Sequence, residues 1–204
     1  MYIHEFSKRG ARYPAYNPIA AGGENACVLH YVENNQQLNN DDLLLVDAGC
    51  EYEMYAADIT RTFPVSGKFS DEQLAIYKVV LDAMNAAIDM VKPGNHIMQP
   101  QEISEKVITK GLVKLGLLDG DPEELHKSGA YKEFYMHKIG HWLGLDVHDA
   151  GDYVEGEEYM KFKPGMITTI EPGIYISSSM DVDDKWKGIG TVSYTHLTLP
   201  TRDD

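Results

Sequence analysis

Short apolar runs near both ends of the chain and a longer helical period in its middle predict a mixture of strands and helices. Apolar, β-branched runs bounded by turn-forming residues are typical of buried strands. We expect strands or extended segments at residues 26–32, 43–47, 55–65, 141–148, 166–170 and 173–176. Residues 1–25 are rich in Tyr, Pro and Gly, which favours loops.

The segment after Gly67 changes to a helical period. Ser70 and Gln73 have the spacing of a capping box at a helix start, and Pro93-Gly94 is expected to end this helix. One apolar face is predicted because apolar residues recur at spacings of three and four. These residues are Leu74, Tyr77, Leu81, Met84, Ile88 and Val91.

A second amphipathic helix is expected at residues 100–115 and a short polar helix at 123–128. The inward residues of the second helix are predicted to be Ile103, Val107, Ile108 and Leu112. Strands, then long helices, then strands favour an α+β fold. We find no linker and no clear repeat, and therefore expect one domain.

Composition excludes some classes of partner. The 204 residues carry a net charge of −14, with 43% apolar and 25% charged residues. Nucleic acids and anionic membranes require a positive surface, so neither is expected to bind. No apolar run is as long as a membrane span. Cys27 and Cys50 form no CxxC pair or disulfide framework, which fits a reducing cytoplasm.

Two aspartates are the first candidates for chemistry. Asp47 ends the apolar run 43–46, and Asp58 lies eleven positions later at the head of the β-prone run 59–65. A carboxylate at the end of a buried strand is costly unless a positive charge meets it. Arg61 is the only cationic side chain close by in the sequence. We therefore predict a metal ion as the partner of these carboxylates.

His141 and Glu171 extend this candidate site. Together with Asp47 and Asp58 they supply three carboxylates and one imidazole, which suit Mn²⁺, Fe²⁺, Co²⁺ or Zn²⁺. Three carboxylates are better balanced by two ions than by one. Each residue alone also has a structural explanation: a turn or cap for an Asp, a core position for His141, and a turn for Glu171. Their common setting in apolar β-prone sequence favours the metal site.

Four segments carry a family resemblance: GGENACVLHY, VDAGCEYEMYAADITRTFPVSGKFS, MHKIGHWLGLDVHD and TIEPGIYI. In this order they resemble the catalytic domain of the Xaa-Pro aminopeptidases (aminopeptidase P), which are pita-bread metallopeptidases. The similarity runs from about residue 4 to residue 190. Methionine aminopeptidase and prolidase share the fold and the ligands, but HWLGLDVHD and DAGCEYEMYAADITRTFPV favour aminopeptidase P.

The resemblance implies a pita-bread fold, with a curved antiparallel sheet flanked by helices and two divalent metals in its cleft. It implies that Asp47 binds one metal, Asp58 bridges both, and His141 and Glu171 bind the other. Manganese is the usual metal of the family. His30, His137 and His148 match histidines that line the cleft and meet the substrate; the alternative for each is a structural histidine.

The implied activity is hydrolysis of the N-terminal Xaa-Pro bond by a hydroxide that bridges two divalent metals. His148 is expected to stabilise the oxyanion, and Glu171 is expected to shuttle the proton. Peptides with proline at the second position are the expected partners. Two alternatives stay open: a prolidase-like dipeptidase, and a metal-free pita-bread module that binds peptides. A homo-oligomer of the full-length protein also stays open.

The end of the chain departs from the family. After WKGIG the family continues with Ile-Arg-Ile-Glu-Asp, whose Glu bridges both metals, whereas this chain reads TVSYTHLTLPTRDD. Residues 192–201 resemble a translated adapter from DNA library preparation. We therefore expect an incomplete catalytic domain at residues 1–190 and a non-native tail at 191–204.

Several consequences are expected from this departure. No residue is matched to the bridging Glu, and His196 is not expected to be a ligand. The last strand region is predicted to be incomplete, and metal binding and activity to be impaired. The natural protein is expected to continue beyond residue 190 and to carry an upstream domain.

Overall fold

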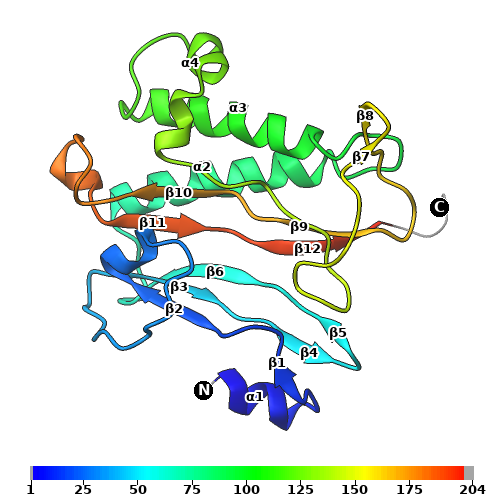
Figure 1. Ribbon diagram of the computed structural model, residues 1–204. Coiled ribbons are helices and arrows are strands. Elements are labelled where there is room, and N and C mark those ends of the chain that lie inside the picture. Colours follow the sequence, from blue (N-terminus) through cyan, green and yellow to red (C-terminus); the bar gives the residue numbers. More distant parts are fainter. Residues whose placement is uncertain (1, 200–204) are drawn as a thin grey trace.

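Helices cover one side of a set of antiparallel strands in the computed structural model, which describes residues 2–199 (Figure 1). Strand β3 (Leu43–Asp47) lies between β2 (Ile19–Gly22) and β6 (Thr60–Pro64). In this register Asp47 pairs with Ile19 on one side and Thr60 on the other. The buried apolar run thus delivers Asp47 to the end of a central strand, as predicted.

A second strand layer lies between this sheet and the helices (Figure 1). Strand β9 (Ile167–Ile170) pairs with β12 (Thr195–Thr198), and β10 (Gly173–Ile176) pairs with β11 (Ile189–Val192). Glu171 and Pro172 connect β9 to β10. An antiparallel bridge between Thr60 and Tyr194 and hydrogen bonds between Thr62 Oγ1 and the Val192 backbone join the two layers.

Shorter strands form two further small sheets. The strands are β1 (Tyr13–Pro14), β4 (Cys50–Tyr52), β5 (Tyr55–Ala56), β7 (Val154–Glu155) and β8 (Glu158–Tyr159). One sheet has the order β1-β4-β5, and in the other β7 pairs with β8. The segment 55–65, expected to be one extended stretch, is divided because residues 57–59 lie between β5 and β6.

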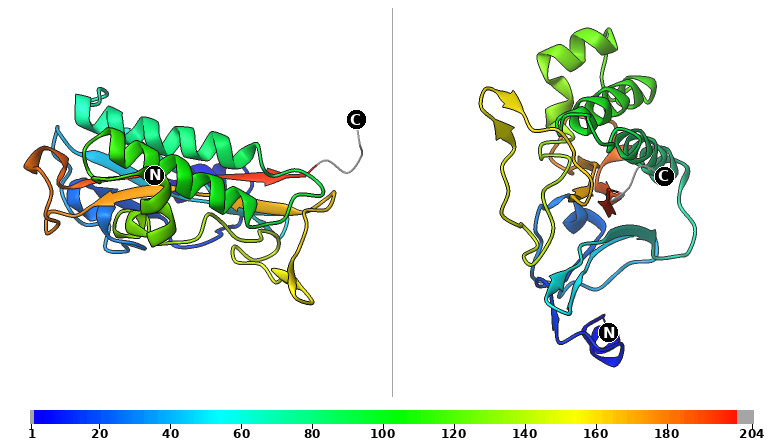
Figure 2. Two further views of the ribbon diagram at one scale, coloured as in Figure 1. Left: turned by 90° about the horizontal axis from the view of Figure 1, so that it is seen from above. Right: turned by 90° about the vertical axis from the view of Figure 1, so that its right-hand side faces the viewer.

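Two long helices, α2 (Asp71–Ile88) and α3 (Gln99–Lys114), lie side by side over the strands (Figure 2). The capping box of Ser70 and Gln73 is confirmed. Helix α4 (Pro122–Ser128) has Asp121 as its N-cap and ends at Gly129 in the left-handed conformation. None of the helices in residues 2–199 is long and apolar enough to cross a membrane.

The inward face of α2 differs from the predicted one. Its buried residues are Ile76, Val80, Ala83 and Ala87, whereas the predicted apolar residues are only half-buried. The difference arises because α2 contacts two neighbours, the strand layer and α3. The two alanines let the helix approach the strands closely, and at Gly111 of α3 an added Cβ would lie 2.4 Å from Val79. In α3, Ile108 and Leu112 are buried as predicted, while Ile103 and Val107 are half-buried.

Three predicted elements are wrong. Residues 26–32 do not form a strand, because a 3-10 helix (Gly23–Cys27) comes first and His30 has a positive φ of 55°. Residues 141–148 form a tight loop with one isolated bridge at Trp142. Residues 1–25 are not only loop, since they contain α1 (Tyr2–Lys8), β1 and β2.

The last strand region is also more complete than expected. Residues 195–198 form β12, although their side chains depart from the family pattern. Strand pairing uses backbone N–H and C=O groups, so β9 can pair with this segment whatever its side chains are. Residues 200–204 of the expected tail lie outside the described residues.

Candidate metal centre

Four elements deliver the predicted ligands to one place. Asp47 ends β3, Asp58 precedes β6, His141 lies in the loop after residue 139, and Glu171 follows β9. His141 Nε2 lies 3.5 Å from Asp58 Oδ2 and 3.6 Å from Glu171 Oε1. Asp47 joins Asp58 through Tyr16, whose hydroxyl donates to both carboxylates. The structure therefore brings together all four residues that the sequence singles out.

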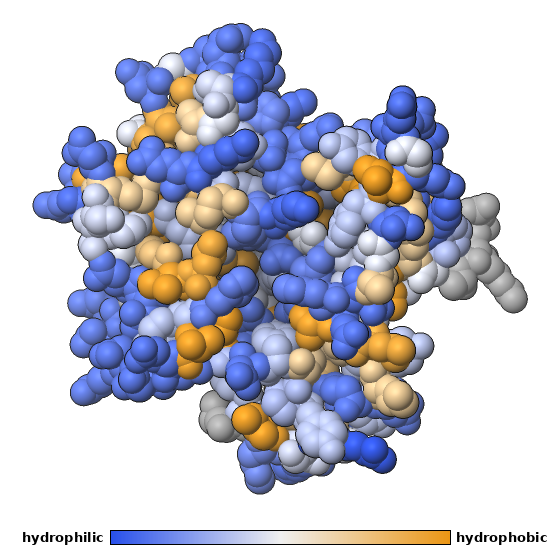
Figure 3. Space-filling model, viewed as in Figure 1, coloured by the Kyte–Doolittle hydropathy of each residue, from blue (hydrophilic) through white to orange (hydrophobic). Residues whose placement is uncertain are grey.

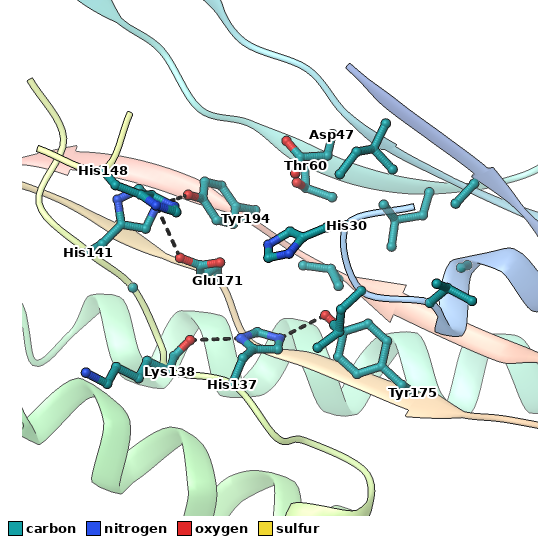
Figure 4. Close-up of a pocket in the computed structure, with 18 of the residues that line it drawn as sticks. His30, Asp47, Thr60, His137, Lys138, His141, His148, Glu171, Tyr175 and Tyr194 are labelled. Atoms are coloured by element: carbon teal, nitrogen blue, oxygen red, sulfur yellow. Dashed lines mark hydrogen bonds and ion pairs between the residues drawn. The ribbon is translucent and has the colours of Figure 1, made fainter. Parts of the chain in front are cut away.

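A cavity of about 430 Å³ opens beside these residues (Figure 4). Asp47, His141 and Glu171 line it, as do the three further candidates His30, His137 and His148. Asp58 lies next to the cavity and is only 4% exposed. Apolar residues also line the cavity: Val28 and Leu29 are exposed at the surface, whereas Ala21 and Leu45 are buried.

The outer face of the molecule is mixed in character. On the side viewed in Figure 3, apolar side chains gather in several patches around the middle of the molecule, separated by hydrophilic ones. The cavity thus combines carboxylates and histidines with apolar residues. Such a combination is typical of a site that orients a ligand by a few polar groups.

Two of the cavity histidines are held in the neutral form. Burial lowers the pKa of His137, whose Nδ1 lies 2.8 Å from the Lys138 carbonyl and whose Nε2 lies 2.8 Å from the Tyr175 hydroxyl. Partial desolvation, followed by the neighbouring His141, lowers the pKa of His148, which is otherwise exposed. The rings of His141 and His148 meet edge to face at 4.3 Å. Neutral imidazoles can accept or donate a hydrogen bond at pH 7.

Burial and mutual repulsion disfavour the ionised forms of Asp47 and Glu171. Burial, with a smaller contribution from Asp58, raises the pKa of Asp47 to about 6. Burial and then Asp58 raise the pKa of Glu171 well above its usual range. Arg61 does not relieve them, because its guanidinium donates to the backbone carbonyls of Thr60 and Tyr194. A cation placed among these carboxylates would relieve both the burial and the mutual repulsion.

Comparison with known proteins identifies the family. The model of metallopeptidase family M24 matches residues 1–201. The chain belongs to metallopeptidase family M24. It is 54% identical over 188 residues to a Xaa-Pro aminopeptidase of Haemophilus influenzae, covering 92% of this chain and 44% of that protein. It is 48% identical over 187 residues to the Xaa-Pro aminopeptidase of Escherichia coli, covering 92% of this chain and 42% of that protein.

Solved structures agree. The chain superposes on the aminopeptidase PepP of Pseudomonas aeruginosa with a TM-score of 0.96 and 52% identity, covering 98% of this chain and 45% of that one. For proline aminopeptidase P II from Yersinia pestis the TM-score is 0.94 and the identity 48%, covering 98% and 46%. The family resemblance and the pita-bread α+β fold are thus confirmed. The chain spans less than half the length of these relatives.

The position of the bridging Glu in the family pattern is occupied differently from what the sequence predicts. We matched no residue to the bridging Glu of the family pattern, but the structure puts Tyr194, the fourth residue after Gly190, against the candidate ligands. Its hydroxyl donates to Asp58 Oδ2 at 2.5 Å and lies 2.7 Å from His141 Nε2. The bridge between Thr60 and Tyr194 fixes this register through the backbone, whatever the side chain is.

The donor set suits divalent cations in its chemistry, since it combines three carboxylates with an imidazole. His141 Nδ1 faces the Trp142 carbonyl at 2.9 Å, which leaves Nε2 available as a ligand atom. Within residues 2–199, however, no three His, Cys, Asp or Glu side chains are arranged to hold an ion directly. The phenol hydroxyls of Tyr16 and Tyr194 lie between the donors instead.

Sequence reasoning missed several residues that shape this site. Tyr16 bridges two carboxylates and Tyr175 contacts His137, yet neither is singled out by the sequence: Tyr16 lies in the Tyr-, Pro- and Gly-rich start of the chain, and Tyr175 lies in a predicted apolar strand. Thr169 Oγ1 accepts from the His141 backbone N–H at 2.8 Å and donates to Glu171 Oε1 at 3.1 Å. Such contacts join residues far apart in the sequence, so only the fold reveals them.

The segment carrying His141 is fixed on both sides. The Glu171 N–H donates to the Ile139 carbonyl at 2.7 Å, and the Ile139 N–H donates to Gln101 Oε1 of α3 at 2.5 Å. At Gly140 an added Cβ would lie 2.0 Å from the Thr169 carbonyl oxygen. Residues 139–141 are therefore pressed against residues 169–171, which holds His141 beside Glu171.

Proposed function

We propose that this chain is the catalytic part of a two-cation aminopeptidase that hydrolyses the peptide bond between an N-terminal residue and a following proline. The observation that carries the proposal is the meeting of Asp47, Asp58, His141 and Glu171 beside one cavity. Relatives that bear the name Xaa-Pro aminopeptidase, at 48% and 54% identity, support the substrate class.

The proposed cations are Mn²⁺ ions, because manganese is the usual metal of the family that the chain resembles. The hard oxygens and one imidazole are compatible with Mn²⁺, and equally with Fe²⁺, Co²⁺ or Zn²⁺. Asp47 would hold one ion, His141 and Glu171 would hold the other, and Asp58 would contact both. When bound, such a pair supplies Lewis acidity that makes water nucleophilic near neutral pH and polarises a carbonyl.

The side chains of the cavity would handle the protons and the substrate. Glu171, whose pKa is raised, can hold a proton beside the cavity and pass it to the leaving proline nitrogen. The neutral His148 can donate a hydrogen bond to the developing oxyanion. His137 and His30, which line the same cavity, would orient the peptide.

The carboxylates beside the cavity would also attract the substrate. A peptide with a free N-terminus carries a positive amine, and the carboxylate cluster offers it the opposite charge. The apolar part of the lining, including Ile19 and Val28, suits the proline ring and neighbouring side chains. We also propose a cytoplasmic setting, supported by Cys27 and Cys50, which are free thiols.

Substitution of the ligands tests this proposal. Asp58→Ala and Glu171→Ala should abolish turnover of Xaa-Pro-Xaa tripeptides and lower metal occupancy together. The assay is done both on this chain and on its Tyr194→Glu variant, because impaired activity is proposed for the chain as it stands. Retained turnover without bound metal would refute the proposal. Cleavage of Xaa-Pro dipeptides but not of tripeptides would favour the prolidase-like alternative.

A further inference from the structure

We infer that Tyr194 closes the cation site of this chain: its hydroxyl fills the space where a divalent cation would lie between Asp58, His141 and Glu171. Figure 4 shows Tyr194, His141 and Glu171 converging on this space from different segments. The inference rests on the proposed function, in that it takes these side chains to be the cation ligands.

The spacing of the donors supports the location. Two donors 2.0–2.2 Å from one ion, at an angle of about 90–110°, lie roughly 2.8–3.6 Å apart. The separations of His141 Nε2 from Asp58 Oδ2, 3.5 Å, and from Glu171 Oε1, 3.6 Å, match this geometry. His141 Nε2 is thus spaced from each of the two carboxylate oxygens as two ligands of one ion would be.

The Tyr194 hydroxyl occupies the same space. It contacts Asp58 Oδ2 at 2.5 Å and His141 Nε2 at 2.7 Å, and so engages two of the three donors. A hydroxyl oxygen and a cation cannot both lie at that point. Binding of an ion therefore requires Tyr194 to move or to become a ligand itself.

Movement of the ring is opposed by its surroundings. Tyr194 is 4% exposed and packs in a cluster with Leu45, Tyr175 and Val192. Its backbone N–H donates to the Thr60 carbonyl at 3.2 Å, and its own carbonyl accepts from Arg61. Because the backbone is fixed and the ring is buried, leaving the site would expose or displace packed apolar surface.

Charge balance adds a second obstacle. A neutral phenol brings no negative charge, so three carboxylates would face two divalent cations. A carboxylate at position 194 would supply a fourth negative charge and a second oxygen that can reach another ion. Tyr194 therefore occupies the space of a cation and also lacks the negative charge that would help to balance two divalent cations.

Titration with Mn²⁺ tests the inference, with bound metal counted by elemental mass spectrometry and affinity measured by calorimetry. We expect the chain as it stands to bind at most one Mn²⁺, and Tyr194→Glu to bind two. Tyr194→Ala, which removes the ring, should bind Mn²⁺ at least tenfold more tightly than the unchanged chain. Tyr194→Phe, which keeps the ring in place, should stay within about threefold of it.

Tyr77→Glu is the matched control, because it adds the same charge at a half-buried position on α2 away from the cavity. This variant should bind Mn²⁺ as the unchanged chain does. Two Mn²⁺ bound to the unchanged chain, as tightly as to Tyr194→Glu, would overturn the inference and leave the proposed function standing. No Mn²⁺ bound to either Tyr194→Glu or Tyr194→Ala, with both folded by circular dichroism, would overturn the proposed function as well.

Discussion

At the scale of single residues, two of the candidate ligands lower the stability of the metal-free protein, because they are carboxyl groups partly or largely removed from water. Asp47 is a partly buried carboxyl whose hydrogen bond from Tyr16 only partly offsets its desolvation. The carboxyl group of Glu171 is likewise desolvated by burial, and the nearby Asp58 carboxylate repels its negative charge. Ionised carboxylates in such settings lower the free energy of unfolding unless a cation joins them.

Asp47→Asn should therefore stabilise the metal-free protein at pH 7. The folded-state pKa of Asp47 is raised from 3.8 to about 6, so the folded state binds the proton more tightly than the unfolded state. The free energy of unfolding consequently falls as pH rises from about 4 to about 6, and stays low above that range. We expect Asn to recover about 1–2 kcal/mol at pH 7.

Urea denaturation at pH 7 and pH 4 measures this effect. The gain from Asp47→Asn should shrink at pH 4, where Asp47 is already protonated in the folded state. Asp119→Asn is the control because Asp119 is exposed, and it should change stability by less than about 0.5 kcal/mol. Equal gains in stability at both pH values, or a loss of stability at pH 7, would contradict the claim that the ionised Asp47 destabilises the folded protein.

At the scale of elements, the site depends on how α3 holds the loop of His141. Gln101 is buried and uses its amide twice: Oε1 accepts from the Ile139 N–H, and Nε2 donates to Glu105 Oε1 at 2.8 Å. The Ile139 carbonyl in turn accepts from Glu171. Gln101 thus positions Ile139, which precedes His141 by two residues and accepts a hydrogen bond from the Glu171 backbone.

Gln101→Leu should loosen this segment. It leaves the Ile139 N–H without its partner, which costs about 1–3 kcal/mol of stability. We also expect Mn²⁺ affinity to fall several-fold when the substitution is made in the Tyr194→Glu chain. Hydrogen exchange at the Ile139 amide should accelerate in the same variant. Ser104→Ala, at a buried neighbouring position on α3, is the control and should leave Mn²⁺ affinity unchanged; a matching loss of affinity there would contradict a specific role for Gln101.

The elements also show what the sequence can and cannot predict. Helices α2 and α4, strands β9 and β10, and the strand ending at Asp47 follow from local patterns and caps. The segments at 26–32 and 141–148 look β-prone but fold as irregular chain, because tertiary contacts outweigh propensity there. The isolated bridge at Trp142 and the hydrogen bond from Asp149 N–H to the Trp142 carbonyl hold the second of these segments.

The same distinction holds for the candidate site. Carboxylates and histidines embedded in apolar sequence are visible as a chemical anomaly, so Asp47, Asp58, His141 and Glu171 could be singled out. Tyr16, Tyr194 and Gln101 could not, because a tyrosine or a glutamine in ordinary sequence carries no such signal. Their importance arises only from contacts across 31 to 136 positions of chain.

At the scale of the whole molecule, the chain combines a confirmed family with an unusual final segment. Its backbone continues the pita-bread fold through β11 and β12, while Tyr194 lies where the resemblance to aminopeptidase P implies a carboxylate. The boundary between residues 1–190 and a non-native tail stays a prediction. Sequencing of the genomic locus should show codons other than those for VSYTHLTLPT; a genomic clone that retains them would contradict the adapter hypothesis.

The most direct measurement of the central claim is anomalous X-ray diffraction at the manganese edge from crystals of the Tyr194→Glu variant grown with Mn²⁺. We expect two anomalous peaks beside the cavity, one next to Asp47 and one next to His141 and Glu171, with Asp58 between them. Bound Mn²⁺ elsewhere on the molecule, with none at these four side chains, would contradict the claim.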